Sequence, residues 1–227
     1  MVEIMIYIAM SSMMMASVYN AFHTQQNSYN SQNNTVEIQQ TVRSGIYTMT
    51  REIRSAGYDP TRITKAGFVK ELPDAPGKFS IDYSKDKNII AFTMDKNGDG
   101  SLHSDSKPEQ NTAEQIAYRL NPAPAARTLQ RFNVTSLKWE DVAGNVDALN
   151  FVYLKQDGTR ATVPQDIQYI EIALLVRSRN AEPKFLNTTT YVNKKNEALW
   201  TPPPGGDHYR RRLLTTTVQM RNVRTAS

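Results

Sequence analysis

The stretch that decides the fold is residues 4–22, IMIYIAMSSMMMASVYNAF, which carries no charged side chain. As an α-helix it would be ~28 Å long, close to the hydrocarbon thickness of a bilayer. A cleaved signal peptide would show basic residues before its apolar run and a small-residue cleavage site after it, and neither pattern is clear here. We therefore expect residues 1–23 to form a transmembrane half-helix. The alternative is a buried helix of a soluble core.

The next segment, residues 24–57, predicts an amphipathic continuation of the same helix. Its first part is rich in Gln, Asn and Ser, and apolar residues then recur at steps of four and three. This stripe consists of Val42, Ile46, Met49, Ile53 and Ala56. Gly57 and Pro60 should end the helix, because Gly tolerates the left-handed cap and Pro cannot continue the hydrogen-bond ladder.

From residue 58 to residue 227 the pattern predicts a β-rich domain. Short β-like runs separated by turn residues replace the helical period. The runs are 88–94, 114–120, 134–139, 148–154, 161–163, 167–177 and 213–220. Asp157-Gly158 between two of them predicts a hairpin turn. An antiparallel sheet would cover the helical stripe, so the predicted fold class is α+β.

Three short motifs resemble known pilins. Residues 2–6, VEIMI, resemble the start of mature type IV pilins, which begin with Phe and carry Glu at the fifth position. Residues 51–60, REIRSAGYDP, resemble the helix end of minor pilins of the PilW type, and residues 211–222, RRLLTTTVQMRN, resemble their last strand. The resemblance does not extend to the basic leader, the Gly at the cleavage point and the Phe-Thr pair, which a pilin gene is expected to encode just before Met1.

The resemblance implies a pilin-like fold and a minor pilin that helps to prime or cap a type IV pilus. It also implies a single-pass inner-membrane protein with a periplasmic carboxyl-terminal domain, later assembled into an extracellular pilus. The expected partners are other major and minor pilins, through the amino-terminal helix. A minor pseudopilin of a type II secretion system and a signal-anchored periplasmic binding protein are the alternatives.

Glu3 is the candidate residue for subunit assembly. It is the only side chain before His23 that is charged at neutral pH, and an unpaired carboxylate at the edge of an apolar segment calls for a partner. The resemblance implies pairing with the positive amino terminus of a neighbouring subunit. The alternative is that Glu3 lies in the headgroup region and is solvated.

A second candidate site is a calcium loop that begins at Asp95. The sequence DKNGDGSLH from this residue onward matches the first half of an EF-hand-like loop, with Gly100 in sixth place. The candidate ligands are Asp95, Asn97, Asp99, Ser101 and Asp105. The twelfth position is Ser106 and no helical pattern flanks the loop, so a true EF-hand is not supported. The alternative is an Asx-rich turn between strands.

Composition and motifs do not favour an enzyme or a nucleic-acid-binding protein. The chain has no cysteine, and its three histidines are far apart, without a metal-ligand spacing. No Gly-x-Ser-x-Gly motif and no glycine-rich phosphate loop occur. Asp207-His208 is expected at an exposed tip beside a proline- and glycine-rich loop. The net charge is +5, and the basic residues gather at residues 210–212 but otherwise mix with acidic ones. A nucleic-acid-binding surface would more often interleave several Lys or Arg with aromatic residues.

Overall fold

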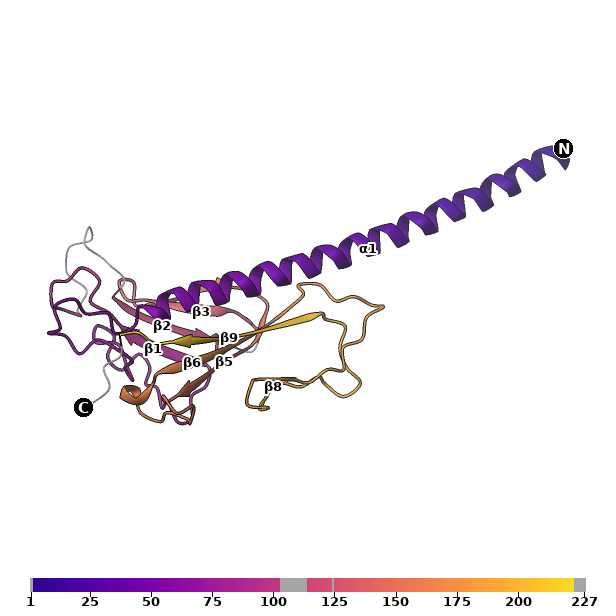
Figure 1. The fold of residues 1–227 in the computed structure, drawn as a ribbon. Helices are drawn as coiled ribbons and strands as arrows, with labels where there is room; N and C mark the ends of the chain where they lie inside the picture. Colours follow the sequence, from indigo (N-terminus) through magenta and orange to yellow (C-terminus); the bar gives the residue numbers. More distant parts are fainter. Residues whose placement is uncertain (1, 103–113, 124, 223–227) are drawn as a thin grey trace.

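A computed structural model describes residues 2–102, 114–123 and 125–222. One helix, α1 (Val2–Arg54), runs unbroken from the amino-terminal end into the β-rich part (Figure 1). All side chains from 2 to 30 are exposed, and burial becomes regular only from Asn34 onward. The helix thus has a free half and a packed half.

The predicted stripe is confirmed as the buried face of α1. Val42, Ile46, Met49 and Ile53 are buried, and Met49 and Ile53 have no exposed surface at all. The helix ends at Arg54, three residues earlier than expected, and a turn carries the chain to Gly57. Gly57 has a φ of 75°, and its amide donates to the Thr93 carbonyl at 3.0 Å, so this glycine joins the helix end to the sheet.

The sheet beneath the helix has three strands. β5 (Val146–Leu154), β6 (Tyr169–Arg177) and β9 (Arg211–Gln219) are antiparallel in the order β5-β6-β9. Helix α1 packs on β9 and β6. Along β6, side chains alternate between the two faces of the sheet, and Leu174 lies on the face that meets the helix.

A second sheet contributes further residues to the core. It contains β1 (Ile89–Thr93), β2 (Gln115–Leu120), β3 (Leu129–Asn133) and β4 (Lys138–Ala143), all antiparallel and in sequence order. A polar contact fixes the packed half of the helix to this sheet. Tyr118 donates to Glu52 at 2.5 Å and Arg131 Nε donates to the same carboxylate at 3.1 Å. Burial, followed by the hydrogen bond and charge of Glu52, raises the pKa of Tyr118.

The long connection between β6 and β9, residues 178–210, forms a third layer, which we call the excursion. It contains the small hairpin of β7 (Tyr191–Val192) and β8 (Ala198–Trp200). β8 contacts β5, and Leu175, on the sheet face away from the helix, is completely buried. One long apolar helix packed on antiparallel sheets confirms the predicted α+β fold. The boundary predicted between residues 23 and 24 stays a prediction.

Several strands were predicted wrongly. Residues 134–137 form a turn and not a strand, because Asn133 Oδ1 accepts the amides of Thr135 and Ser136. The expected strand 161–163 is reduced to a bridge at Arg160, since Pro164 begins the 3-10 turn η2 (Pro164–Asp166). The turn at residues 157–158 is confirmed. Strands β3, β7 and β8 were not predicted.

Gly45 lies at the closest approach of helix and sheets. A Cβ atom there would be 2.9 Å from Leu174 Cδ2 and 3.5 Å from Leu129 Cδ2, and both leucines are completely buried. We expect Gly45→Val to lower the free energy of unfolding by ~2 kcal/mol, because the core cannot yield space. The measurement is urea unfolding of the full chain in detergent, followed by tryptophan fluorescence.

Ser44→Val is the matched control, since Ser44 is exposed on the adjacent helical position. It places the same β-branched side chain in the same helix and should change stability by only a few tenths of a kcal/mol. Equal unfolding midpoints for the two variants would contradict close packing at Gly45.

Candidate functional site

The free half of α1 is the first candidate site. The helix is long and apolar enough to cross a membrane by length and composition, and its most apolar 18-residue window has a mean hydropathy of 1.5 and no buried surface. Glu3 lies exposed in the first turn of this helix. The helix can therefore act as a membrane anchor, whereas the role of Glu3 in assembly stays a prediction.

The second feature is the junction where α1 leaves the β-rich part. Glu182 of the excursion accepts hydrogen bonds from Asn34 at 3.2 Å and from Arg210 at 2.8 Å. Desolvation acts to raise the pKa of Glu182, but the hydrogen bonds from Arg210, Asn34 and Ser31 outweigh it and lower that pKa. Arg210 also stacks over Phe185, with 4.3 Å from its guanidinium carbon to the ring centre. The excursion is thereby fastened to the helix.

A groove of about 930 Å³ lies beside this junction. One wall is the polar stretch of α1 from Thr24 to Glu37, and the other is the start of the excursion, residues 179–185, with Arg210. Asparagine and serine side chains predominate on the helix wall. The groove therefore presents amides, hydroxyls and charged groups and not an apolar slot.

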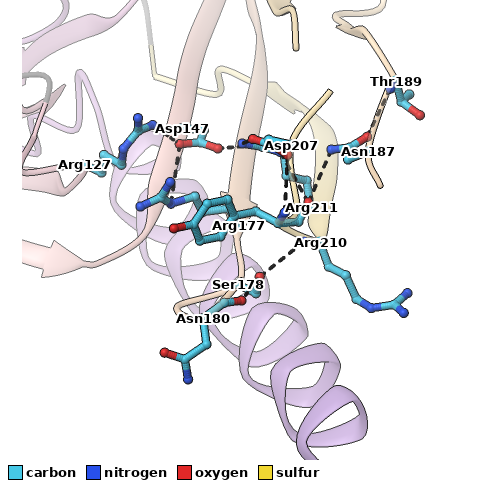
Figure 2. Close-up of polar contacts among 11 residues, drawn as sticks. Arg127, Asp147, Arg177, Ser178, Asn180, Asn187, Thr189, Asp207, Arg210 and Arg211 are labelled. Atoms are coloured by element: carbon cyan, nitrogen blue, oxygen red, sulfur yellow. Dashed lines mark hydrogen bonds and ion pairs between the residues drawn. The ribbon is translucent and has the colours of Figure 1, made fainter. Parts of the chain in front are cut away.

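A network of buried charges holds the other end of the excursion (Figure 2). The Asp147 side chain is fully buried on β5 and pairs with Arg127 and with Arg211, whose Nε lies 2.6 Å from Oδ2. Arg177 Nε is 3.9 Å from the same carboxylate. The Arg211 side chain, only 2% exposed, makes two 2.6 Å hydrogen bonds to Asp207.

Aromatic rings of the excursion cover this network. Arg211 stacks over Trp200 at 3.6 Å and Arg177 over Tyr209 at 4.2 Å. Arg177 and Arg211 are also directly opposite one another in the β6–β9 register. Two like charges at opposed positions repel each other, so the carboxylate of Asp147 is needed between them.

A third fastening holds the β7–β8 hairpin. Asn193, which is buried, donates to Asn150 on β5 at 3.1 Å and to Glu197 at 2.9 Å. Glu197 also accepts from Arg160 at 2.6 Å and from Lys87 at 3.1 Å. The hydrogen bond from Asn193, followed by that from Arg160, lowers the pKa of Glu197 to about 2.

The loop at Asp95 has a hydrogen-bond network of its own. Asp95, with no exposed surface, accepts the amides of Gly98 at 2.7 Å and Gly100 at 3.0 Å. Asn97 and Asp99 bond to one another, and Asp99 accepts the amide of Ser101. These are Asx-type turns, in which backbone amides already donate hydrogen bonds to the carboxylate oxygens.

The calcium hypothesis therefore stays a prediction. Asp105, its fifth candidate ligand, lies outside the described residues. Within the described ranges, no three His, Cys, Asp or Glu side chains come together as metal ligands.

Sequence reasoning missed the buried network and misplaced one pair. Asp207 was expected at an exposed tip, but its side chain is only 19% exposed because it pairs with Arg211. His208 is exposed, and its Nδ1 lies 2.6 Å from the Phe185 carbonyl oxygen. The run of three arginines is also not one basic patch, since Arg210 and Arg211 are paired internally. The strand pattern that begins at Arg211 could have indicated that this side chain is buried, because it places the side chain on the face of the strand away from solvent.

We expect Asp147→Asn to lower the free energy of unfolding by ~3 kcal/mol, because it removes the buried carboxylate that Arg127, Arg177 and Arg211 share. Asp166→Asn is the control: the Lys155–Asp166 pair is 3.2 Å apart, with side chains 42% and 41% exposed. Its loss should change stability by under ~1 kcal/mol. Urea unfolding measures both, and a similar small effect for the two variants would contradict a stabilising network.

Glu197 should make stability depend on pH. Its pKa falls from the ordinary 4.5 to about 2 on folding, so its contribution is complete above pH 4.5 and is lost as the pH falls through 2. Glu197→Gln should flatten the fall in stability between these values. The measurement is the unfolding midpoint as a function of pH; an unchanged slope in the variant would show that the Glu197 contacts are not maintained in solution.

Comparisons with known proteins identify a matching family. Residues 31–194 match the family model "Prepilin peptidase-dependent protein B", a match that covers well over half of the chain. No curated protein matches the chain. Among solved structures, a type IV-like pilin from Thermus thermophilus is similar, with 17% identity, a TM-score of 0.49, and coverage of 83% of this chain and 97% of that one.

The family match does not identify the PilW type, and it does not distinguish a subunit of a pilus from a subunit of a secretion system. It does bear out the broader part of the resemblance, namely the pilin superfamily. The chain therefore belongs to the family of prepilin peptidase-dependent protein B, and its class is that of the pilins and pseudopilins.

Proposed function

We propose that this chain is a minor pilin, an assembly subunit that helps to prime or cap a type IV pilus. The observation that supports it best is the division of α1 into an exposed apolar half and a half fixed to the sheets. An apolar helix projecting from a folded domain needs either lipid or other helices around it, because water solvates it poorly. A subunit that moves from a membrane into a filament core offers it both environments.

In this proposal the β-rich part faces the periplasm while residues 4–22 cross the inner membrane. On assembly, the free helical half leaves the lipid and packs among the helices of other major and minor pilins. Apolar packing then replaces lipid contacts with little change in hydrophobic free energy, so directional interactions must set the order of the subunits. A charge in an apolar setting is such an interaction.

Glu3 is the residue that we propose for this task. It lies in the first turn of α1, where a carboxylate also interacts favourably with the helix dipole. Pairing with the amino terminus of a neighbouring subunit would neutralise both charges in a dry environment and fix the axial register. Because Glu3 is far from the β-rich part, a substitution of Glu3 should change assembly without changing the folding of that part.

We expect Glu3→Ala to leave the β-rich part folded but to reduce incorporation into filaments. A pairing worth only ~1.4 kcal/mol would change incorporation about tenfold. The measurement is mass spectrometry of this chain in sheared filaments, with whole-cell levels as the reference.

The matched control is Glu37→Ala, which removes a carboxylate that is exposed on the same helix but outside its apolar run. It should incorporate like the wild type. Normal incorporation of Glu3→Ala would remove the register role. If the wild-type chain is absent from sheared pili but required for protein secretion, the pseudopilin alternative holds instead.

A further inference from the structure

We infer that residues 179–186, the first loop of the excursion, bind the anionic headgroups of the membrane in which α1 is anchored. The loop, which we call the cationic loop, carries exposed Arg179 and Lys184. This inference rests on the proposed insertion of residues 4–22 in a bilayer. It adds a second contact with lipid, made by the β-rich part.

The first observation is the position of the loop along the helix. The excursion reaches farther beside α1 toward its amino-terminal end than the strands do (Figure 1). Its first loop forms one wall of the groove whose helix wall begins at Thr24. Thr24 is only ~3 Å beyond Phe22 along the helix axis, at 1.5 Å per residue. The headgroup layer is ~5–7 Å thick, so the outer end of the groove lies within it.

The junction fixes the middle of the loop, at Glu182, at a known height. Glu182 bonds to Asn34, which is ~18 Å from Phe22 along the axis and hence ~11 Å from the outer edge of the headgroups. Long cationic side chains and a Debye length of ~8–10 Å bridge that gap. The part of the loop around Glu182 is therefore within electrostatic reach of the surface.

The second observation is the charge that remains after internal pairing. Glu182, the only acid of the cationic loop, is already paired with Arg210. In the part of the chain that the structure describes, Arg179 and Lys184 make no ion pair. Across the groove, Glu37 opposes them with one carboxylate, but it lies on the far side of Asn34 from the membrane. Two exposed cations thus lie in the loop on either side of a neutralised acid.

The third observation is an apolar side chain in the same loop. Leu186 is 55% exposed, and Pro183 beside Lys184 is exposed too. Exposed apolar groups next to cations are typical of segments that lie in a membrane interface. At an anionic leaflet surface the cations are attracted to the headgroups while Leu186 enters the interface, so the two kinds of side chain act in the same direction.

The test uses the full chain, reconstituted in vesicles of phosphatidylcholine alone or of phosphatidylcholine with phosphatidylglycerol. The protein has no cysteine, so Pro183→Cys gives one attachment point for an environment-sensitive fluorophore. We expect blue-shifted, stronger emission in the anionic vesicles, with the effect suppressed by high salt. Since each cation near an anionic surface strengthens binding about fivefold, Arg179→Glu/Lys184→Glu should weaken the loop contact by at least roughly 30-fold.

Lys65→Glu/Lys138→Glu is the matched control, because it makes the same charge change at exposed sites away from the groove. It should leave the emission shift intact. Equal emission in the two kinds of vesicle, or a shift that survives reversal of Arg179 and Lys184, would overturn the inference. Loss of the shift in the control variant would overturn it as well.

Flotation with neutral vesicles separates this inference from the proposed function. A chain that inserts in neutral vesicles but shows no lipid-dependent emission contradicts only the loop contact. A chain that fails to insert in them contradicts the membrane anchor, and the loop contact with it.

Discussion

The rest of the structure depends on the packing of one helical stripe on the β6–β9 face, because the two halves of α1 lie in different environments. Its second half buries Val42, Ile46, Met49 and Ile53 among sheet side chains. Its first half has no protein partner within the described residues. Gly45 permits the close approach that the stripe requires, since its missing side chain leaves room for Leu174 and Leu129. The packed half sets the direction in which the free half of α1 leaves the β-rich part, and the proposed membrane contacts depend on that direction.

Charge pairs hold the excursion to the rest of the molecule. Glu182, Glu197 and Asp207 each join it to another part of the molecule, and each has a pKa lowered by its hydrogen-bond donors. Such contacts are directional, so they position the excursion more sharply than apolar packing alone would. The position matters because the excursion covers one face of the β5-β6-β9 sheet and also carries the cationic loop along the helix. Structure and proposed lipid contact therefore depend on the same fastenings.

The predicted strands differed in reliability for a physical reason. β1, β5 and β6 are largely apolar or alternate between apolar and polar residues, so their sequence pattern identifies them. β3 mixes polar and apolar residues, and its neighbour 134–137 turns because of the Asn133 side chain. β7 and β8 are only two and three residues long and exist because the sheet supports them. Local pattern carries too little information for such elements.

By itself, the sequence determined the uncharged run at 4–22, the helical stripe after it, the helix end near Gly57 and the apolar or alternating pattern of the longer strands beyond that glycine. Each of these depends on residue spacing within a single element, which the chain order preserves. Only the tertiary structure decided that Arg211 is buried between Asp147 and Asp207, residues that are distant in sequence or were expected at the surface. It also decided that residues 179–186 lie beside Thr24 to Asn34 of the helix. Contacts across such separations depend on how sheets and helix close together in space, and no local periodicity encodes them.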